Sequence, residues 1–80
     1  MWIRTQDKRR LIKCVVFEVS QEIPTIFSYT TNGGFSLGEY STQKKALKVL
    51  DMIEKQINHF SGTSIVNIPV FQMPQDEEVF

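Results

Sequence analysis

Residues 33–50 read GGFSLGEYSTQKKALKVL, and this stretch joins a turn, a strand and a helix in direct succession. The Asn-Gly-Gly triplet at 32–34 tolerates the positive φ values of a tight turn, so the flanking segments are expected to pair as a β-hairpin. From Ala46 onward, apolar residues recur at three- and four-residue spacings, which predicts an amphipathic helix capped by Ser41 or Thr42. A hairpin that leads directly into a helix indicates an α+β domain.

The predicted helix has one apolar face and one solvated face. Its apolar stripe consists of Ala46, Val49, Leu50, Ile53, Ile57 and Phe60. The opposite side carries Lys44, Lys48, Asp51, Lys55 and Asn58. Ser61 and Gly62 supply the expected stop, and the apolar stripe is expected to lie against the sheet.

Turn signals at short intervals divide the chain before the helix into strand-like runs. The expected strands are residues 2–5, 11–19, 25–31 and 35–40, arranged as a meander. The run 11–19 is so rich in Val, Ile and Phe that its middle is expected to be covered on both faces. We therefore predict an α+β fold in which a curved antiparallel sheet of about four strands packs on one C-terminal helix.

Residues 65–73 form a further extended segment after the helix. Pro69 interrupts it and cannot donate a ladder hydrogen bond, so the segment is expected to be an edge strand, a broken strand or a strap. The last residues, PQDEEVF, read as an acidic tail. We expect a single domain over residues 1–73 and a flexible tail over residues 74–80.

The composition bounds the possible functions. The chain has 80 residues, with nine Lys and Arg balanced by nine Asp and Glu, which is typical of a small globular domain. This balance argues against a general attraction to nucleic acid or to anionic lipid, and no stretch is apolar enough to span a membrane. A lone cysteine, Cys14, makes neither an internal disulfide nor a cysteine zinc site and fits a reducing cytoplasm. No export signal is expected, because the run CVVFEV is short and contains Glu18.

The spacing of Gly33 and Gly38 matches the two glycines of a phosphate-binding loop. Such a loop requires a lysine and a hydroxyl residue after the second glycine, whereas Glu39 and Tyr40 follow here. We therefore expect no nucleotide site. Gly38 is expected instead to relieve crowding or to mark a β-bulge.

Lys44 and Lys45 lie in the first turn of the expected helix, where the helix dipole disfavours cations by about 0.3–1 kcal/mol each. Two explanations remain open. A bound phosphate or carboxylate would offset this cost, and so would solvent screening. Solvent screening is the favoured explanation because the cost is small.

No enzymatic site stands out in the sequence. Cys14 and His59 are the only thiol and imidazole, but the thiol lies in an apolar strand and the imidazole at a helix end, where both have structural explanations. Asp51 and Glu54 read as helix-surface carboxylates. We expect no catalytic residue, cofactor or metal ion, and no membrane contact.

A cluster of cations near an aromatic residue is the first candidate binding surface. It consists of Trp2, Arg4, Lys8, Arg9, Arg10 and Lys13. A hairpin of this kind grips phosphates and stacks on a base in some nucleic-acid-binding proteins. The alternative is a charged turn that keeps a hairpin soluble, and Asp7 within the cluster favours it.

A second candidate surface is the segment after the helix. Its apolar residues are the predicted dimer interface: Val66, Ile68, Val70 and Phe71. An edge strand offers unpaired backbone groups to a neighbouring chain, and a short domain has a limited core. The acidic run QDEE of one chain is expected to lie against Arg9 and Arg10 of another, so that charge sets the orientation of a two-fold dimer.

Three segments carry a resemblance: MWIRTQD at the start, LGEYSTQKKALKVLDMI in the middle and VFQMP near the end. Together they resemble a group of short, uncharacterised proteins of Firmicutes-type bacteria and their prophages. The resemblance implies a bacterial intracellular setting and carries over no catalytic residue.

These observations favour a small non-enzymatic binding module that self-associates or binds a partner protein. The alternative is a nucleic-acid-binding accessory protein that uses the hairpin from Arg4 to Lys13. A weaker third hypothesis is a sensor of small anions at Lys44 and Lys45.

Overall fold

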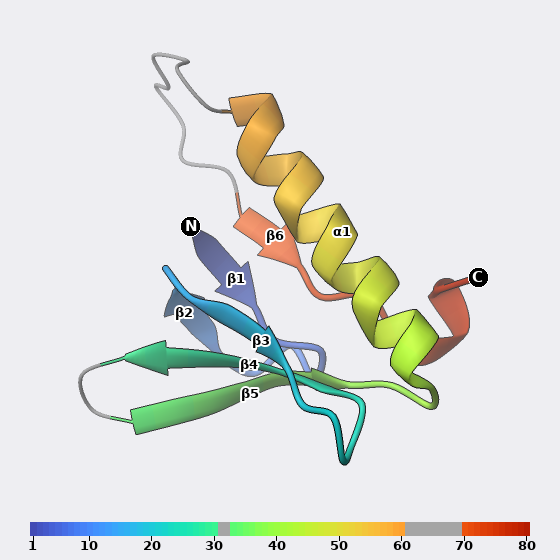
Figure 1. Ribbon diagram of the computed structural model, residues 1–80. Helices are drawn as coiled ribbons and strands as arrows, with labels where there is room; N and C mark the ends of the chain where they lie inside the picture. Colours follow the sequence, from blue (N-terminus) through green and yellow to red (C-terminus); the bar gives the residue numbers. More distant parts are fainter. Residues whose placement is uncertain (31–32, 61–69) are drawn as a thin grey trace.

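The computed structural model describes residues 1–30, 33–60 and 70–80, which form two sheets, one long helix and a short 3-10 helix (Figure 1). The elements are β1 (Trp2–Arg4), β2 (Leu11–Lys13), β3 (Phe17–Val19), β4 (Thr25–Thr30), β5 (Gly33–Glu39), α1 (Gln43–Phe60), β6 (Val70–Gln72) and η1 (Asp76–Glu78). The strands form two three-stranded sheets with the orders β2-β1-β6 and β3-β4-β5. The α+β prediction is confirmed, whereas the prediction of a single curved sheet is wrong.

The division into two sheets arises in the apolar run 11–19, which was expected to be one strand. The pairing of β1 with β2 extends as far as Cys14, because the Cys14 N–H donates to the Met1 carbonyl at 2.7 Å and the Met1 ammonium donates to the Cys14 carbonyl at 2.9 Å. Val15 and Val16 then cross to the second sheet and are 79% and 49% exposed. The expected burial of this middle on both faces is therefore wrong, because β-branched composition favours extended backbone without choosing the neighbour it pairs with.

The hairpin predicted around 32–34 is confirmed by the antiparallel pairing of β4 with β5; residues 31–32 themselves lie outside the described ranges. The ladder contains an irregularity, because Ile26 faces Gly38 while Phe27 faces Ser36. Leu37 is thus the extra residue of a β-bulge on β5, and both Leu37 and Gly38 are buried. A Cβ atom on Gly38 would lie 3.2 Å from the Gln6 Cβ and 3.2 Å from the Tyr40 hydroxyl. Gly38 therefore both borders a bulge and relieves crowding.

Helix α1 lies against β3 and β4 of the second sheet (Figure 1). The Lys45 N–H donates to the Thr42 hydroxyl at 3.1 Å, so Thr42 is the N-cap. Ala46, Val49 and Ile53 of the predicted stripe are fully buried. Leu50 is half-buried and Ile57 is 44% exposed, and the side chain of Phe60 is not among those described. The apolar stripe is thus most deeply buried between Ala46 and Ile53.

The chain after the helix returns to the first sheet. Strand β6 pairs in parallel with β1, and the Met73 N–H extends this ladder by donating to the Arg4 carbonyl at 3.0 Å. The expected edge strand is confirmed at residues 70–72, and Pro69 lies outside the described residues. Residues 74–80, expected to be a flexible acidic tail, instead include η1 and pack beside the start of α1 (Figure 1). Val79 anchors this end because its side chain is buried.

One apolar core connects both sheets, the helix and the C-terminal end. Its buried members are Ile3, Cys14, Ile26, Leu37, Tyr40, Ala46, Val49, Ile53, Met73 and Val79. Residues of the first sheet meet those of the second inside this core, so the two sheets cannot separate without exposing apolar surface.

The crowding at Gly38 predicts a position-specific loss of stability. Replacing Gly38 with Ala should lower the free energy of unfolding by about 1–3 kcal/mol, because the new Cβ displaces Gln6 and the buried Tyr40 ring. Urea unfolding measures the loss. Gly34→Ala is the matched control on the same strand, because its only tight contact would be with the ring of the exposed Tyr29, 3.2 Å away, and the Ser28 carbonyl at 3.9 Å is in ordinary contact. An equal loss in both variants would contradict the prediction.

Candidate functional site

The loop between β1 and β2 is held by the side chain of Thr5, which is buried at its base. The Thr5 hydroxyl donates to Asp7 Oδ1 at 2.6 Å and accepts the Arg10 N–H at 3.1 Å. Asp7 Oδ1 also accepts the Arg9 N–H at 3.0 Å, and the Lys8 N–H donates to the Thr5 carbonyl at 2.8 Å. Four hydrogen bonds over six residues thus fix the backbone that carries the cations.

The backbone conformation of Lys8 and the charge of Asp7 show that this loop has one defined conformation. Lys8 adopts a left-handed backbone conformation with φ of 67°, which costs a non-glycine residue about 1 kcal/mol. Its carbonyl accepts a hydrogen bond from Arg4 Nε at 3.1 Å. The Thr5 hydroxyl and then the Arg9 N–H lower the pKa of Asp7, which keeps this carboxylate charged as the acceptor at the centre of the loop.

The first sheet has one face turned to the core and one turned outward. Ile3 is buried on the inner face, and alternation along each strand places its neighbours on the outer one. In the registers of β1, Trp2 lies between Lys13 and Val70, and Arg4 lies between Leu11 and Gln72. We call these six residues the open face. Leu11 and Val70 are 56% and 49% exposed there, and Trp2 is half-buried.

A hollow of about 380 Å³ lies where the open face meets the loop. It is lined by Arg4, Lys8, Arg9, Arg10, Leu11 and Val70. Among the described residues the structure contains one ion pair, between Lys45 and Asp76, so none of the cations of this hollow forms an ion pair. The Asp7 carboxylate lies close enough to Arg9 and Arg10 for their charges to lower its pKa. The structure therefore brings the predicted cluster together: four cations rim the hollow, and Lys13 stands beside Trp2 on the open face.

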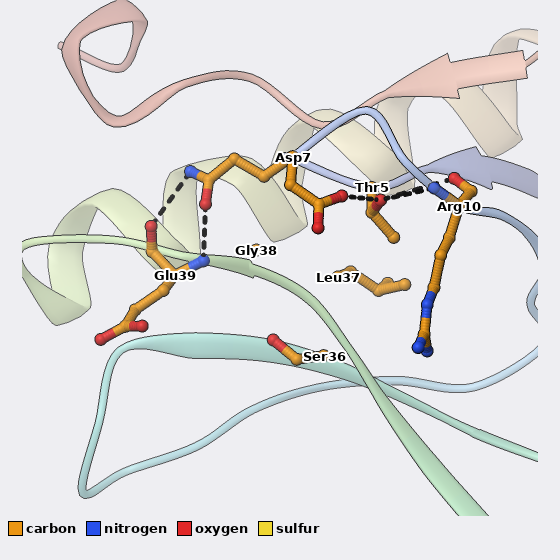
Figure 2. A pocket seen from close by; sticks show the side chains of 8 residues that line it. Thr5, Asp7, Arg10, Ser36, Leu37, Gly38 and Glu39 are labelled. Atoms are coloured by element: carbon orange, nitrogen blue, oxygen red, sulfur yellow. Dashed lines mark hydrogen bonds between the residues drawn. The ribbon is translucent and has the colours of Figure 1, made fainter.

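A second hollow of about 370 Å³ lies on the seam between the loop and the end of β5 (Figure 2). It is lined by Thr5, Gln6, Asp7, Arg10, Ser36, Leu37, Gly38 and Glu39, and we call it the seam hollow. Gln6 forms its base through the Gln6 N–H, which donates to the Leu37 carbonyl at 2.8 Å. The Gln6 side-chain amide accepts the Glu39 N–H at 2.9 Å and donates to the Glu39 carbonyl at 3.0 Å.

Gln6 also binds the C-terminal segment. Its side-chain amide donates to the Pro74 carbonyl at 3.2 Å, and its own carbonyl accepts the Gln75 side-chain amide at 2.7 Å. The Tyr40 hydroxyl donates to the same Pro74 carbonyl at 2.8 Å, and burial raises the pKa of Tyr40 further from neutrality. We call the contacts of Gln6 with Leu37, Glu39, Pro74 and Gln75 the Gln6 latch. Nothing in the periodicity of the sequence marks Gln6, because a glutamine in a polar turn has no distinctive pattern.

The predicted anion site at the helix start receives a carboxylate from the chain itself. Asp76 Oδ1 accepts the Ser41 N–H at 2.7 Å, and Asp76 Oδ2 lies 3.4 Å from Lys45 Nζ. The Ser41 N–H, then the Ser41 side chain and the Lys45 ammonium, lower the pKa of Asp76. This carboxylate offsets the helix dipole at Lys45, while Lys44 stays exposed.

The other candidate residues do not form a catalytic arrangement. Cys14 is buried, its Sγ donates to the Ile12 carbonyl at 3.5 Å, and burial raises the pKa of its thiol. His59 lies at the end of α1, with its side chain outside the described set. Within the described part of the chain, no group of three or more His, Cys, Asp or Glu side chains gathers to hold a metal ion. The same residues form no helix that is long and apolar enough to cross a membrane.

The residues of the predicted dimer interface have different environments. Val66 and Ile68 lie outside the described residues. Val70 is on the open face, whereas Phe71 faces the other way, packs against the core and lies opposite Ile3. The described half of the proposed interface therefore offers one exposed apolar side chain.

The contacts of Asp76 predict a loss of stability in acid. Its pKa is lowered on folding, so its contribution to stability is fully present above its unfolded pKa of about 4 and is lost as the pH falls through the lower folded value. Asp76→Asn should therefore flatten the fall of the melting temperature on the acid side. Melting curves from neutral pH to pH 2 measure this, with Glu77→Gln as the control for removing one exposed charge from η1. Parallel acid-side slopes in the parent and Asp76→Asn would contradict the assignment.

The structure thus gathers the basic cluster around one hollow, gives Lys45 an internal partner and adds a seam hollow that the sequence did not indicate. Comparison of the chain with protein-family models, curated proteins and solved structures finds no match.

Proposed function

We propose that this protein is a non-enzymatic binding module that holds an acidic, partly apolar segment of a partner protein on its open face. The observation that carries the proposal is the hollow in which four cations, none of them in an ion pair, line the same surface as exposed Leu11 and Val70. Carboxylates of a partner would pair with the cations, and its apolar side chains would cover the two aliphatic residues. A phosphodiester chain offers nothing apolar at that place.

Nucleic acid is the second candidate, and the position of Trp2 favours it. Trp2 is on the central strand of the open face. It lies beside Lys13 of the neighbouring strand, and Arg4 is the next residue of its own strand on the same face. Single-stranded nucleic acids stack bases on aromatic side chains of this kind while cations follow the phosphates. The balanced net charge of the chain supplies no long-range attraction, which leaves this candidate behind the first.

Self-association through the acidic C-terminal run has weaker support. Asp76 already binds Ser41 and Lys45 of its own chain, and Glu78 accepts the N–H of Gln75 at 2.8 Å. These contacts would have to break before the run could reach the cations of a second chain. A cytoplasmic setting and a relationship to short Firmicutes and prophage proteins remain predictions.

Reversing charge on the open face should weaken partner binding without unfolding the protein, because the altered side chains are exposed. The probe is a blocked decapeptide that alternates glutamate with leucine, and binding is followed by fluorescence anisotropy at several salt concentrations. The double variant Arg4→Glu, Lys13→Glu should bind it at least about tenfold more weakly than the parent. The matched control is Lys44→Glu, Lys48→Glu, which reverses two exposed helix charges and should keep the affinity of the parent.

An oligothymidylate measured in parallel separates the two candidates. The proposal expects the peptide to bind more tightly than the oligonucleotide at physiological salt. Tighter oligonucleotide binding that falls steeply with salt and is lost on Trp2→Ala would replace the first candidate with the second. Equal peptide binding by both double variants would exclude the open face as the binding surface.

A further inference from the structure

The seam hollow lies along a sheet edge that is covered over only part of its length. Strand β5 has β4 on one side only, since it ends the sheet order β3-β4-β5. On its outer side the Gln6 latch occupies Leu37 and Glu39. In the described structure, Gly34, Phe35 and Ser36 have no hydrogen-bond partner beyond β4. An edge strand presents unpaired N–H and C=O groups, so this stretch can accept a further strand.

Gln6 shows what kind of group this edge accepts. A strand residue exchanges two hydrogen bonds with its neighbour through one N–H and one C=O. The Gln6 carboxamide makes the same exchange with Glu39, accepting its N–H at 2.9 Å and donating to its carbonyl at 3.0 Å. The side-chain amide of Gln6 thus takes the place of one peptide unit of a neighbouring strand beside β5. An extended peptide would make the same kind of hydrogen bonds along the outer edge of β5 toward residue 34.

The charges of the seam hollow define the side chains of that peptide. Figure 2 shows Arg10 and Glu39 at opposite ends of the hollow, with Ser36 and Leu37 between them. The Arg10 guanidinium lies 5.9 Å from the centre of the Phe35 ring, and among the described residues it makes no hydrogen bond or ion pair. Ring contact thus holds a cation at one end with its donors available, and Glu39 supplies a carboxylate at the other. The Asp7 carboxylate also lines the hollow, where its Oδ1 already accepts hydrogen bonds from Thr5 and Arg9.

We propose that an extended peptide adds to the outer edge of β5 at residues 34–36 and enters the seam hollow at Ser36, with an acidic side chain toward Arg10 and a basic one toward Glu39. Main-chain hydrogen bonds to β5 supply affinity, and the two opposite charges fix the direction of the peptide. This surface is distinct from the open face, and the inference stands whether or not the open face binds an acidic segment.

The test uses the blocked pentapeptide acetyl-Thr-Glu-Val-Lys-Thr-amide and amide chemical shifts of the nitrogen-15-labelled protein. At a peptide concentration of about 1 mM, the range in which short unoptimised peptides bind, the largest changes in amide chemical shift should occur at Gly34, Phe35 and Ser36. A peptide N-methylated at Glu, Val and Lys lacks the central backbone donors and should produce no such shifts. Arg10→Gln should weaken binding about tenfold by removing the charged partner. The open-face variant Arg4→Glu, Lys13→Glu should bind the pentapeptide as the parent does.

Three outcomes would overturn the proposal. Absence of shifts at residues 34–36 would show that the edge accepts no strand. Equal shifts with the N-methylated peptide would show that the hollow holds the side chains without strand addition. Undiminished binding by both Arg10→Gln and Glu39→Gln would show that the opposite charges do not select the ligand; Glu39→Gln is informative because the Gln6 latch uses only the backbone of Glu39.

Discussion

The hydrogen bonds of Gln6 are the constraint on which the rest of the molecule depends. The Gln6 N–H donates to the carbonyl of Leu37 in the bulge, and the Gln6 carboxamide pairs with both the N–H and the carbonyl of Glu39. The same carboxamide and the Gln6 carbonyl hold Pro74 and Gln75. One residue in a surface turn thereby connects the first sheet, the second sheet and the C-terminal segment. The first sheet would be marginal alone, since its three strands have three residues each and bury little surface.

The Gln6 latch also determines where the charged surfaces lie. It fixes the loop that follows β1, and the hydrogen bonds of Thr5 and Asp7 then hold Lys8, Arg9 and Arg10 in place. Arg10 contributes to both hollows, because it stands between the open face and the seam. The two proposed binding surfaces are thus consequences of one rigid turn. The stability of the fold and the shape of the two proposed binding surfaces depend on the same few contacts.

Local features of the fold were predictable from the sequence, and long-range ones were not. The glycine turn before β5, the Thr42 cap and the buried residues Ala46, Val49 and Ile53 follow from chemistry within a few residues. The division of residues 11–19 between two sheets and the parallel pairing of β6 with β1 depend on partners far away in the chain. Lys45 illustrates the same limit, because the carboxylate that pairs with it lies 31 residues further on. The cations of the basic cluster were identifiable because they are close in sequence, whereas the seam hollow combines two distant segments.

Equilibrium urea unfolding of Gln6→Ala tests the central role of Gln6 most directly. Removing the carboxamide deletes three hydrogen bonds and should lower the free energy of unfolding by about 1–3 kcal/mol. The amide of Glu39 should at the same time exchange with solvent faster than in the parent, because it loses its acceptor. Gln21→Ala, a change of the same side chain at an exposed loop position, should alter stability by no more than about 0.5 kcal/mol. A Gln6→Ala variant as stable as Gln21→Ala, with unchanged exchange at Glu39, would contradict the conclusion that Gln6 joins the two sheets.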